Sequence, residues 1–364
     1  MMQNTSSLVR NSLCTANFNP CHALLAVLSV LCFSTTGAHA QNPGSAPIHI
    51  PVAMWQKNAN GIKKPRINIG IGDLPPLPVG FDTGSSGLHV FADANLMAPN
   101  SGVKCSDIAT TVTYGNPPLI TFSGVVCYAS LHFGDYVSPA PVPIAYLTSA
   151  SCPPQNPKCT IPKLTDPGAM GGYGIFGLGL TGAQSGDNTI PNPILTLPAP
   201  YGSSYSVRLT NGQDGGELVL GSDEPANSVP FHLTPTAIGG ANWSNAKACL
   251  FVNGGAIDTC LQISFDTGNP VSWIHNANTP LIPQYPPGFV KPPTSIGFAP
   301  EGVATQTVSV VAGTTPFVDQ IKVLDIANAP ALTNTGIQVF FGQIVTYNNE
   351  AGTISFAPLI FPAP

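Results

Sequence analysis

The chain has 364 residues, of which only 8% are charged, against roughly 25% in a typical soluble domain. Its 39 Pro and 37 Gly residues argue against a long helical protein, and its hydrophobic content of 43% argues against disorder. The net charge is −5, and the one basic cluster is the short segment 63–66 (KKPR), so we expect no nucleic-acid partner.

Residues 1–40 have the features of a secretory signal peptide. They contain one Arg and no acidic residue, an apolar run at 23–33, and an Ala-x-Ala cleavage site at 38–40. The alternative, a buried core segment, leaves this order of features unexplained. The apolar run is too short to span a bilayer, which needs about 20 residues. We therefore expect a secreted or periplasmic protein with no stable membrane insertion after cleavage.

Six cysteines remain after the expected cleavage, and an even number in an exported chain indicates disulfides. Sequence proximity favours Cys152–Cys159 and Cys249–Cys260, which leaves Cys105–Cys127, although six cysteines allow about 15 pairings. The alternative use, zinc binding, is disfavoured because no C-x-x-C or H-x-x-x-H spacing occurs. We expect no metal and no cofactor.

Short β-rich runs separated by Gly, Pro, Asn and Asp follow one another along the chain. This pattern is typical of an all-β protein. A short helix is expected at 93–97. The clearest runs are 66–71, 125–133, 206–209, 217–220 and 353–356.

One internal repeat dominates the sequence. The segment Phe-Asp-Thr-Gly at 81–84 recurs at 265–268, and each copy ends an expected strand. Each copy is followed by two large apolar residues and Gly, at 175–177 and at 340–342. The repeat predicts two homologous halves. We place the N-terminal half at 41–193 and the C-terminal half at 194–364.

Paired Asp-Thr-Gly segments predict a specific chemistry if the two halves bring Asp82 and Asp266 together. Two carboxylates about 3 Å apart cannot both ionise easily, so the pair holds one proton over a wide acidic range. One carboxylate can then take a proton from water while the other donates a proton to a carbonyl. Gly84 and Gly268 would permit the tight turns. Thr83 and Thr267 would hydrogen-bond across the interface.

These segments resemble those of the pepsin-like aspartic peptidases. Residues 81–90 (FDTGSSGLHV) are similar to the first catalytic motif of that family, and Tyr114-Gly115 to the substrate-covering flap. Further similar segments occur in the family's order at 174–178, 215–221, 265–268 and 349–358. The resemblance implies a bilobal fold of two homologous β-barrel-like lobes, with an active-site cleft between them.

Two positions depart from the family pattern. His89 stands where the family usually has a Trp that supports the flap Tyr. Asn269 follows the second Asp-Thr-Gly, where Thr or Ser is usual, whereas Ser85 follows the first copy in the usual way. Ser85 and Asn269 are accordingly expected to support the two aspartates.

The sequence therefore predicts an exported aspartic endopeptidase that hydrolyses polypeptides at acidic pH by water activation between Asp82 and Asp266. We expect a monomer, because one chain supplies both aspartates. Two alternatives remain open. One is a non-catalytic binding or inhibitor-like protein on the same fold, and the other is an exported β-rich structural protein in which the repeats form only turns.

Overall fold

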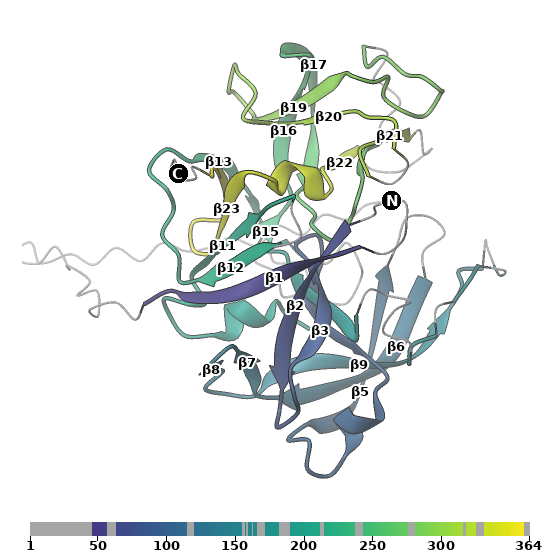
Figure 1. Ribbon diagram of the computed structural model, residues 1–364, viewed down its shortest axis with the longest axis vertical. Coiled ribbons are helices and arrows are strands. Elements are labelled where there is room, and N and C mark those ends of the chain that lie inside the picture. Colours follow the sequence, from purple (N-terminus) through teal and green to yellow (C-terminus); the bar gives the residue numbers. More distant parts are fainter. Residues whose placement is uncertain are drawn as a thin grey trace, which may run out of the picture. The chain divides into compact units, whose positions relative to one another are not determined.

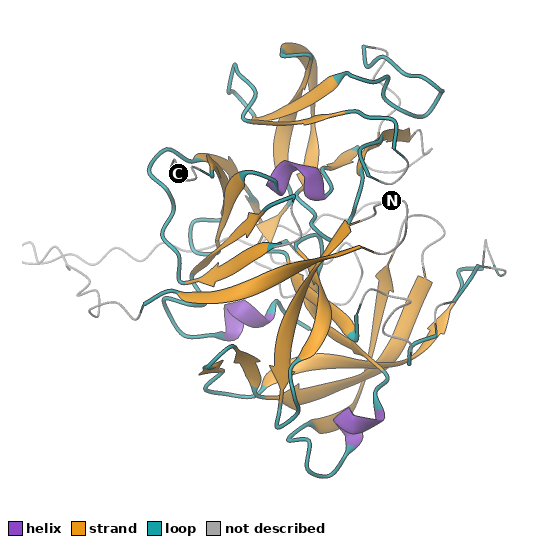
Figure 2. Ribbon diagram, viewed as in Figure 1, coloured by secondary structure: helices purple, strands orange, loops and turns teal. Residues whose placement is uncertain are grey.

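The computed structural model describes residues 46–56, 63–114, 120–154, 157, 159–161, 163–165, 172–181, 190–211, 215–236, 243–275, 281–315, 318–324 and 331–359. The regular structure of this part is almost entirely β-strand, with a few short 3-10 helices (Figure 2). The expectation of an all-β protein is confirmed. The expected signal peptide lies outside the described residues. None of the described helices has the length and apolar character that crossing a membrane requires.

Among the described residues, the larger sheet has 15 strands. Its main path runs β13-β24-β23-β11-β12-β1-β2-β3-β10-β4-β9-β6-β5. Outside this path, β7 pairs with β2 and with β8. The strand bounds are β1 Ile48–Gln56, β2 Lys63–Ile71, β3 Leu77–Asp82, β4 Ser86–Phe91, β5 Lys104–Tyr114, β6 Ile120–Ala129, β7 Leu131–Phe133, β8 Tyr136–Val137, β9 Val142–Ser151, β10 Gly174–Leu178, β11 Ser204–Leu209, β12 Gly216–Leu220, β13 Val229–His232, β23 Gln343–Asn348 and β24 Thr353–Pro358.

A second sheet has seven strands in the order β20-β19-β16-β17-β22-β18-β21, and β14 and β15 form a separate pair. Figure 1 shows β16, β17, β19 and β20 grouped together, apart from β5, β6 and β9. The bounds are β14 Thr234–Pro235, β15 Trp243–Ser244, β16 Ala246–Val252, β17 Gly255–Ser264, β18 Ser272–His275, β19 Ser295–Pro300, β20 Val308–Val311, β21 Ile321–Leu324 and β22 Leu332–Asn334. The 3-10 helices are η1 Ala94–Met97, η2 Pro193–Thr196 and η3 Ile337–Phe340.

The expected short helix at 93–97 is confirmed as η1. Asp93 begins it, and the side chain of Asp93 accepts a hydrogen bond from the Asn95 amide at 2.8 Å, which satisfies a donor that the helix leaves open. The expected boundary between the two halves, near residue 193, falls at the start of η2.

The sheets contain the same four-strand arrangement twice. In the first copy β10 runs parallel to β3 and antiparallel to β4, which runs parallel to β9. In the second copy β22 runs parallel to β17 and antiparallel to β18, which runs parallel to β21. The order β3-β10-β4-β9 therefore matches β17-β22-β18-β21, strand by strand and direction by direction. The internal duplication read from the sequence is thus visible in the strand pairing.

The pairing corrects one sequence prediction. The second apolar-apolar-Gly segment was placed at 340–342, but register places it earlier in the chain. Gly80 pairs with Ile175, and the equivalent residue Ser264 pairs with Asn334, so Asn334-Thr335-Gly336 corresponds to Ile175-Phe176-Gly177. The pattern at 340–342 misled because Phe340 belongs to η3, where it is fully buried against the ring of Phe356.

The core explains how the two Asp-Thr-Gly segments are fixed. Residues at alternate positions of a strand face the same side, and Val79 and Phe81 of β3 are buried on one side of the sheet. In the second copy the ring of Phe265 packs between Phe231 and Phe356, with ring centroids 4.9 and 4.7 Å away. A buried phenylalanine therefore anchors the backbone directly before each aspartate.

The six cysteines of the described chain form three disulfides, Cys105–Cys127, Cys152–Cys159 and Cys249–Cys260. The pairing favoured by the sequence is confirmed. Two of the bridges join register partners on neighbouring strands, β5 with β6 and β16 with β17. Three bridges fit a protein that folds in an oxidising compartment.

We predict that Phe176→Ala lowers the free energy of unfolding by about 3–5 kcal/mol, because it removes a ring from the centre of the first four-strand unit. Phe176 is fully buried, pairs with Phe81 and contacts the ring of Phe133. Denaturant unfolding measures the change. The control Val311→Ala, at a position 55% exposed, should change the unfolding free energy by less than about 0.5 kcal/mol. Equal effects of the two substitutions would contradict this account of the core.

Candidate functional site

The two Asp-Thr-Gly loops are joined by a reciprocal set of hydrogen bonds between Thr83 and Thr267. The Thr83 amide donates to Thr267 Oγ1 at 3.1 Å, and the Thr267 amide donates to Thr83 Oγ1 at 3.0 Å. Each hydroxyl also donates to a backbone carbonyl of the other loop, Thr83 to Phe265 at 2.8 Å and Thr267 to Phe81 at 3.0 Å. Both threonines are buried, so this set fixes one loop against the other. The predicted contact between the threonines is confirmed.

The glycine of each loop lies directly against the aspartate of the other. A Cβ added to Gly84 would lie 2.3 Å from Asp266 Cγ, and one added to Gly268 would lie 2.5 Å from Asp82 Oδ1. Neither distance leaves room for a side chain. The two carboxyl groups are therefore brought together, and glycine is required at both positions because of this close approach.

Asp82 is held by its own loop. The Gly84 amide donates to Asp82 Oδ1 at 2.8 Å, and the Ser85 hydroxyl donates to Asp82 Oδ2 at 2.6 Å. Ser85 thus contacts the aspartate that it was predicted to support.

Asp266 is held differently, by one loop residue and one distant residue. The Asn269 amide donates to Asp266 Oδ1 at 3.1 Å, while the Asn269 side chain accepts from the Val271 amide at 3.4 Å. The donor to Asp266 Oδ2 is Nδ2 of Asn334, at 2.6 Å. Asn334, at the end of β22, thus donates a hydrogen bond to Asp266 as Ser85 does to Asp82.

The sequence analysis missed Asn334. Matching residues 334–336, rather than 340–342, with residues 175–177 would have identified it. Its Oδ1 accepts a hydrogen bond from the Gly336 amide at 2.9 Å, which orients the amide so that Nδ2 faces Asp266. The segment Asn334-Thr335-Gly336 carries no large apolar pair, so it did not match Ile175-Phe176-Gly177 by residue type. An alignment of Gly336 with Gly177 alone would have placed Asn334 beside Ser264, which lies two residues before Asp266.

The pKa of Asp266 is raised from its ordinary value to about 8, chiefly by burial and next by the negative charge of Asp82. The Asn334 hydrogen bond lowers the pKa, the hydrogen bond with Asp82 raises it, and the positive charge of Lys64 lowers it. The two carboxyl groups titrate as a pair. The pair therefore retains one proton well above the pH at which an isolated Asp loses its own.

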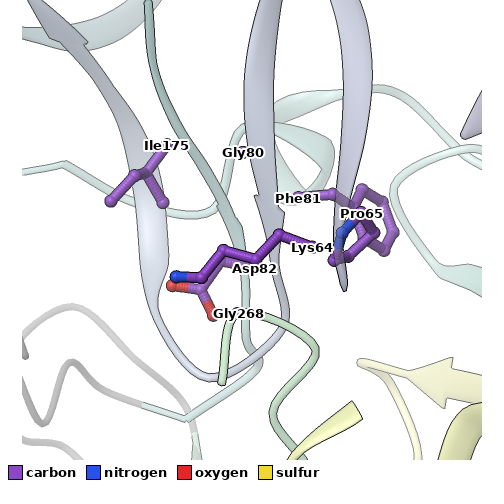
Figure 3. A pocket seen from close by; sticks show the side chains of 7 residues that line it. All are labelled: Lys64, Pro65, Gly80, Phe81, Asp82, Ile175 and Gly268. Atoms are coloured by element: carbon purple, nitrogen blue, oxygen red, sulfur yellow. The ribbon is translucent and has the colours of Figure 1, made fainter. Parts of the chain in front are cut away.

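Lys64 is the second residue that the sequence analysis missed. It lines a small hollow of about 40 Å³ together with Pro65, Gly80, Phe81, Asp82, Ile175 and Gly268. Its amino group points toward the Asp82 carboxyl group (Figure 3). The sequence showed only a basic cluster at 63–66, and nothing in its pattern indicated that strand β2 brings Lys64 to Asp82.

His89 and Tyr114 contact each other beside the first loop. The Tyr114 hydroxyl lies 2.6 Å from His89 Nδ1, and the two rings meet edge to face with centroids 5.7 Å apart. His89, which differs from the family pattern, thus makes a polar contact with Tyr114. Tyr114 ends β5 and pairs with Ile120 of β6, so it lies near the tip of a hairpin. Gly115, predicted as part of the flap, lies outside the described residues.

The described residues contain no group of three or more His, Cys, Asp or Glu side chains that could hold a metal ion. No protein-family model matches the chain, and a comparison with curated protein sequences finds no significant match.

We predict that the unfolding free energy of the wild-type protein falls as the pH rises from about 4 to about 8. Over this range the unfolded chain releases the Asp266 proton, whereas the folded chain retains it because its pKa is raised. Asp266→Asn carries no such proton and should gain on the order of a few kcal/mol relative to wild type at pH 8.

Thermal unfolding at several pH values measures this difference. Asp223→Asn, at an exposed position, is the matched control and should follow the wild-type profile. Parallel profiles for the wild type and Asp266→Asn would show that the folded chain does not raise this pKa.

Proposed function

We propose that the chain is an aspartic-type endopeptidase of the pepsin-like kind, with a bilobal fold and a peptide-binding cleft over the two aspartates. One observation carries the proposal. Two equivalent strand-turn segments are hydrogen-bonded to each other through Thr83 and Thr267, and the aspartate carboxyl group of each segment lies against the glycine of the other. A duplicated turn with no chemical role would not need both glycines to pack against the opposite carboxyl groups.

The geometry supports hydrolysis without a covalent intermediate. The ionised carboxylate of the pair takes a proton from a water molecule, whose oxygen attacks the peptide carbonyl carbon, while the protonated carboxyl donates its proton to the carbonyl oxygen. The resulting gem-diol intermediate collapses when its C–N bond breaks. The leaving nitrogen takes a proton from the protonated carboxyl group, and a gem-diol hydroxyl gives its proton to the other carboxylate as the carbonyl re-forms, so the pair again holds one proton. The water, the substrate and the pair supply every proton, so neither metal nor cofactor is part of this proposal.

The residues around the pair have supporting roles in this proposal. Ser85 and Asn334 hold the two carboxyl groups from opposite sides and fix their orientation. Tyr114 covers the substrate from its hairpin, and His89 positions the Tyr114 ring. The N-terminal segment directs export to a secreted or periplasmic location, and one chain supplies the complete site as a monomer.

A second candidate, a non-catalytic binding protein on the same fold, is favoured by the position of Lys64. Its amino group points to the carboxyl group where substrate and water would meet (Figure 3). The intact glycines, both threonines and the hydrogen bonds to each carboxyl group weigh against this candidate. They preserve the pair in detail, which binding alone would not require.

We predict that the purified chain cleaves an unfolded protein at about pH 3–5, and that pepstatin abolishes the cleavage. Asp82→Asn should lower kcat at least about 100-fold, because it removes a general acid–base group. The control Asp223→Asn should retain full activity. Absence of cleavage by the folded wild type at every pH, or full activity of Asp82→Asn, would overturn the proposed function.

We also predict that Lys64→Met moves the upper pH limit of activity to higher pH. The positive charge of Lys64 lowers the Asp266 pKa, so its removal lets the pair keep its proton at higher pH. The pH profile of kcat/KM measures this shift. Lys247→Met, which removes an exposed charge on β16, should leave the profile unchanged. An unchanged profile for Lys64→Met would exclude an electrostatic effect of Lys64 on the pair.

A further inference from the structure

A second hollow, of about 350 Å³, lies close to the aspartate pair. It is lined by residues 51–55 of β1, by Arg66 and Asn68 of β2, and by Pro78 of β3. Its volume is within the range of sites that bind small molecules or single side chains. None of its lining residues is acidic, and Arg66 is its one charged residue.

The strand pairing places this hollow and Asp82 on the same face of the sheet. Pro78, Gly80 and Asp82 alternate with the buried Val79 and Phe81, so the first three share the outer face.

Arg66 pairs with Gly80, which also lines the hollow at Asp82. Strand β2 therefore contributes Lys64 to one hollow and, two residues later, Arg66 to the next. An extended peptide over Asp82 would reach Arg66 after roughly three residues, at about 3.3 Å per residue.

Arg66 is held in position but has no anionic partner among the described residues. Its guanidinium lies over the Trp55 ring, with the Arg66 Cζ atom 3.8 Å from the ring centroid. The Nε atom is buried and makes no hydrogen bond, and no carboxylate in the described part of the chain pairs with the guanidinium. Burial also lowers the Arg66 pKa, because the charge has lost part of its hydration. Stacking on one face leaves the edge of the guanidinium for a planar acceptor.

We propose that this hollow binds a carboxylate side chain of the peptide substrate, so that the enzyme prefers polypeptides with Glu or Asp roughly three residues from the cleaved bond. A carboxylate matches the fork of Arg66 in shape and charge, and two parallel hydrogen bonds would satisfy its unused donors. The Asn68 side chain at the rim adds a further polar contact. This inference rests on the proposed function, since it assigns the substrate class to the same site.

The test uses pairs of peptides that differ only by Glu or Gln, placed in turn at each of the four positions on either side of the cleaved bond. At pH 5–6, where Glu is ionised, the wild type should prefer Glu at one position by about 10–100-fold in kcat/KM, mainly through KM. Arg66→Gln should abolish this preference, so that the Glu and Gln peptides are cleaved with equal kcat/KM. Arg66→Lys keeps the charge but not the fork, and should retain only part of the preference.

Two controls separate the possible outcomes. Lys104→Gln removes an exposed charge on β5 and should keep the full preference. Wild-type preference should fall as the pH drops below about 4, because the Glu side chain becomes neutral. A wild-type enzyme with no Glu preference, or a preference that survives in Arg66→Gln, would overturn the inference.

Failure of the proposed function is distinguishable from failure of this subsite. If the wild type cleaves no peptide, the peptidase proposal fails, and calorimetric binding of the same peptide pairs still tests the hollow. Tighter binding of the Glu peptide to wild type than to Arg66→Gln would support the carboxylate site. Equal binding to both would refute it.

Discussion

The reciprocal hydrogen bonds between Thr83 and Thr267 are the interaction on which the rest of the site depends. Each hydroxyl accepts from the opposite amide and donates to the opposite carbonyl, so both loops have their buried polar groups satisfied only when they are together. Loss of either hydroxyl would leave buried groups of the other loop unpaired. This requirement brings two carboxyl groups close to each other, an arrangement that charge repulsion opposes when both are ionised.

The duplicated strand arrangement supplies symmetry, and the side chains around the aspartates break it. Asp82 accepts from Ser85 of its own loop, whereas Asp266 accepts from Asn334, which is brought in by β22. Lys64 approaches from β2, on the side of Asp82 (Figure 3). Two carboxyl groups in equal surroundings would share a proton equally. Unequal surroundings separate their proton affinities, which general acid–base chemistry needs.

The sequence predicted those features that local patterns encode. Short β-rich runs between turn residues predicted strands, a short helix was expected at 93–97, and the spacing of the cysteines favoured the three disulfides that are observed. The Thr-Thr contact followed from the duplicated motif. Asn334 and Lys64 escaped prediction because each reaches the aspartates through sheet register, which no short segment specifies. The repeat at 340–342 was assigned wrongly because apolar side chains serve the core of η3 as readily as they mark a repeat.

Because only 8% of the residues are charged, each charge near the aspartate pair has a large effect on the electrostatic potential at this site. With only 12 Lys and Arg in 364 residues, a basic side chain beside the aspartates has few neighbours of either sign to offset its field. Strand β2 brings Lys64 to the aspartate pair and Arg66 to the adjoining hollow on the same face. Elsewhere, Glu217 pairs with His49 and Arg208 at partly exposed positions, where an ion pair contributes little to stability. Acidification can therefore change the protonation of the aspartate pair while the surrounding sheets keep their structure.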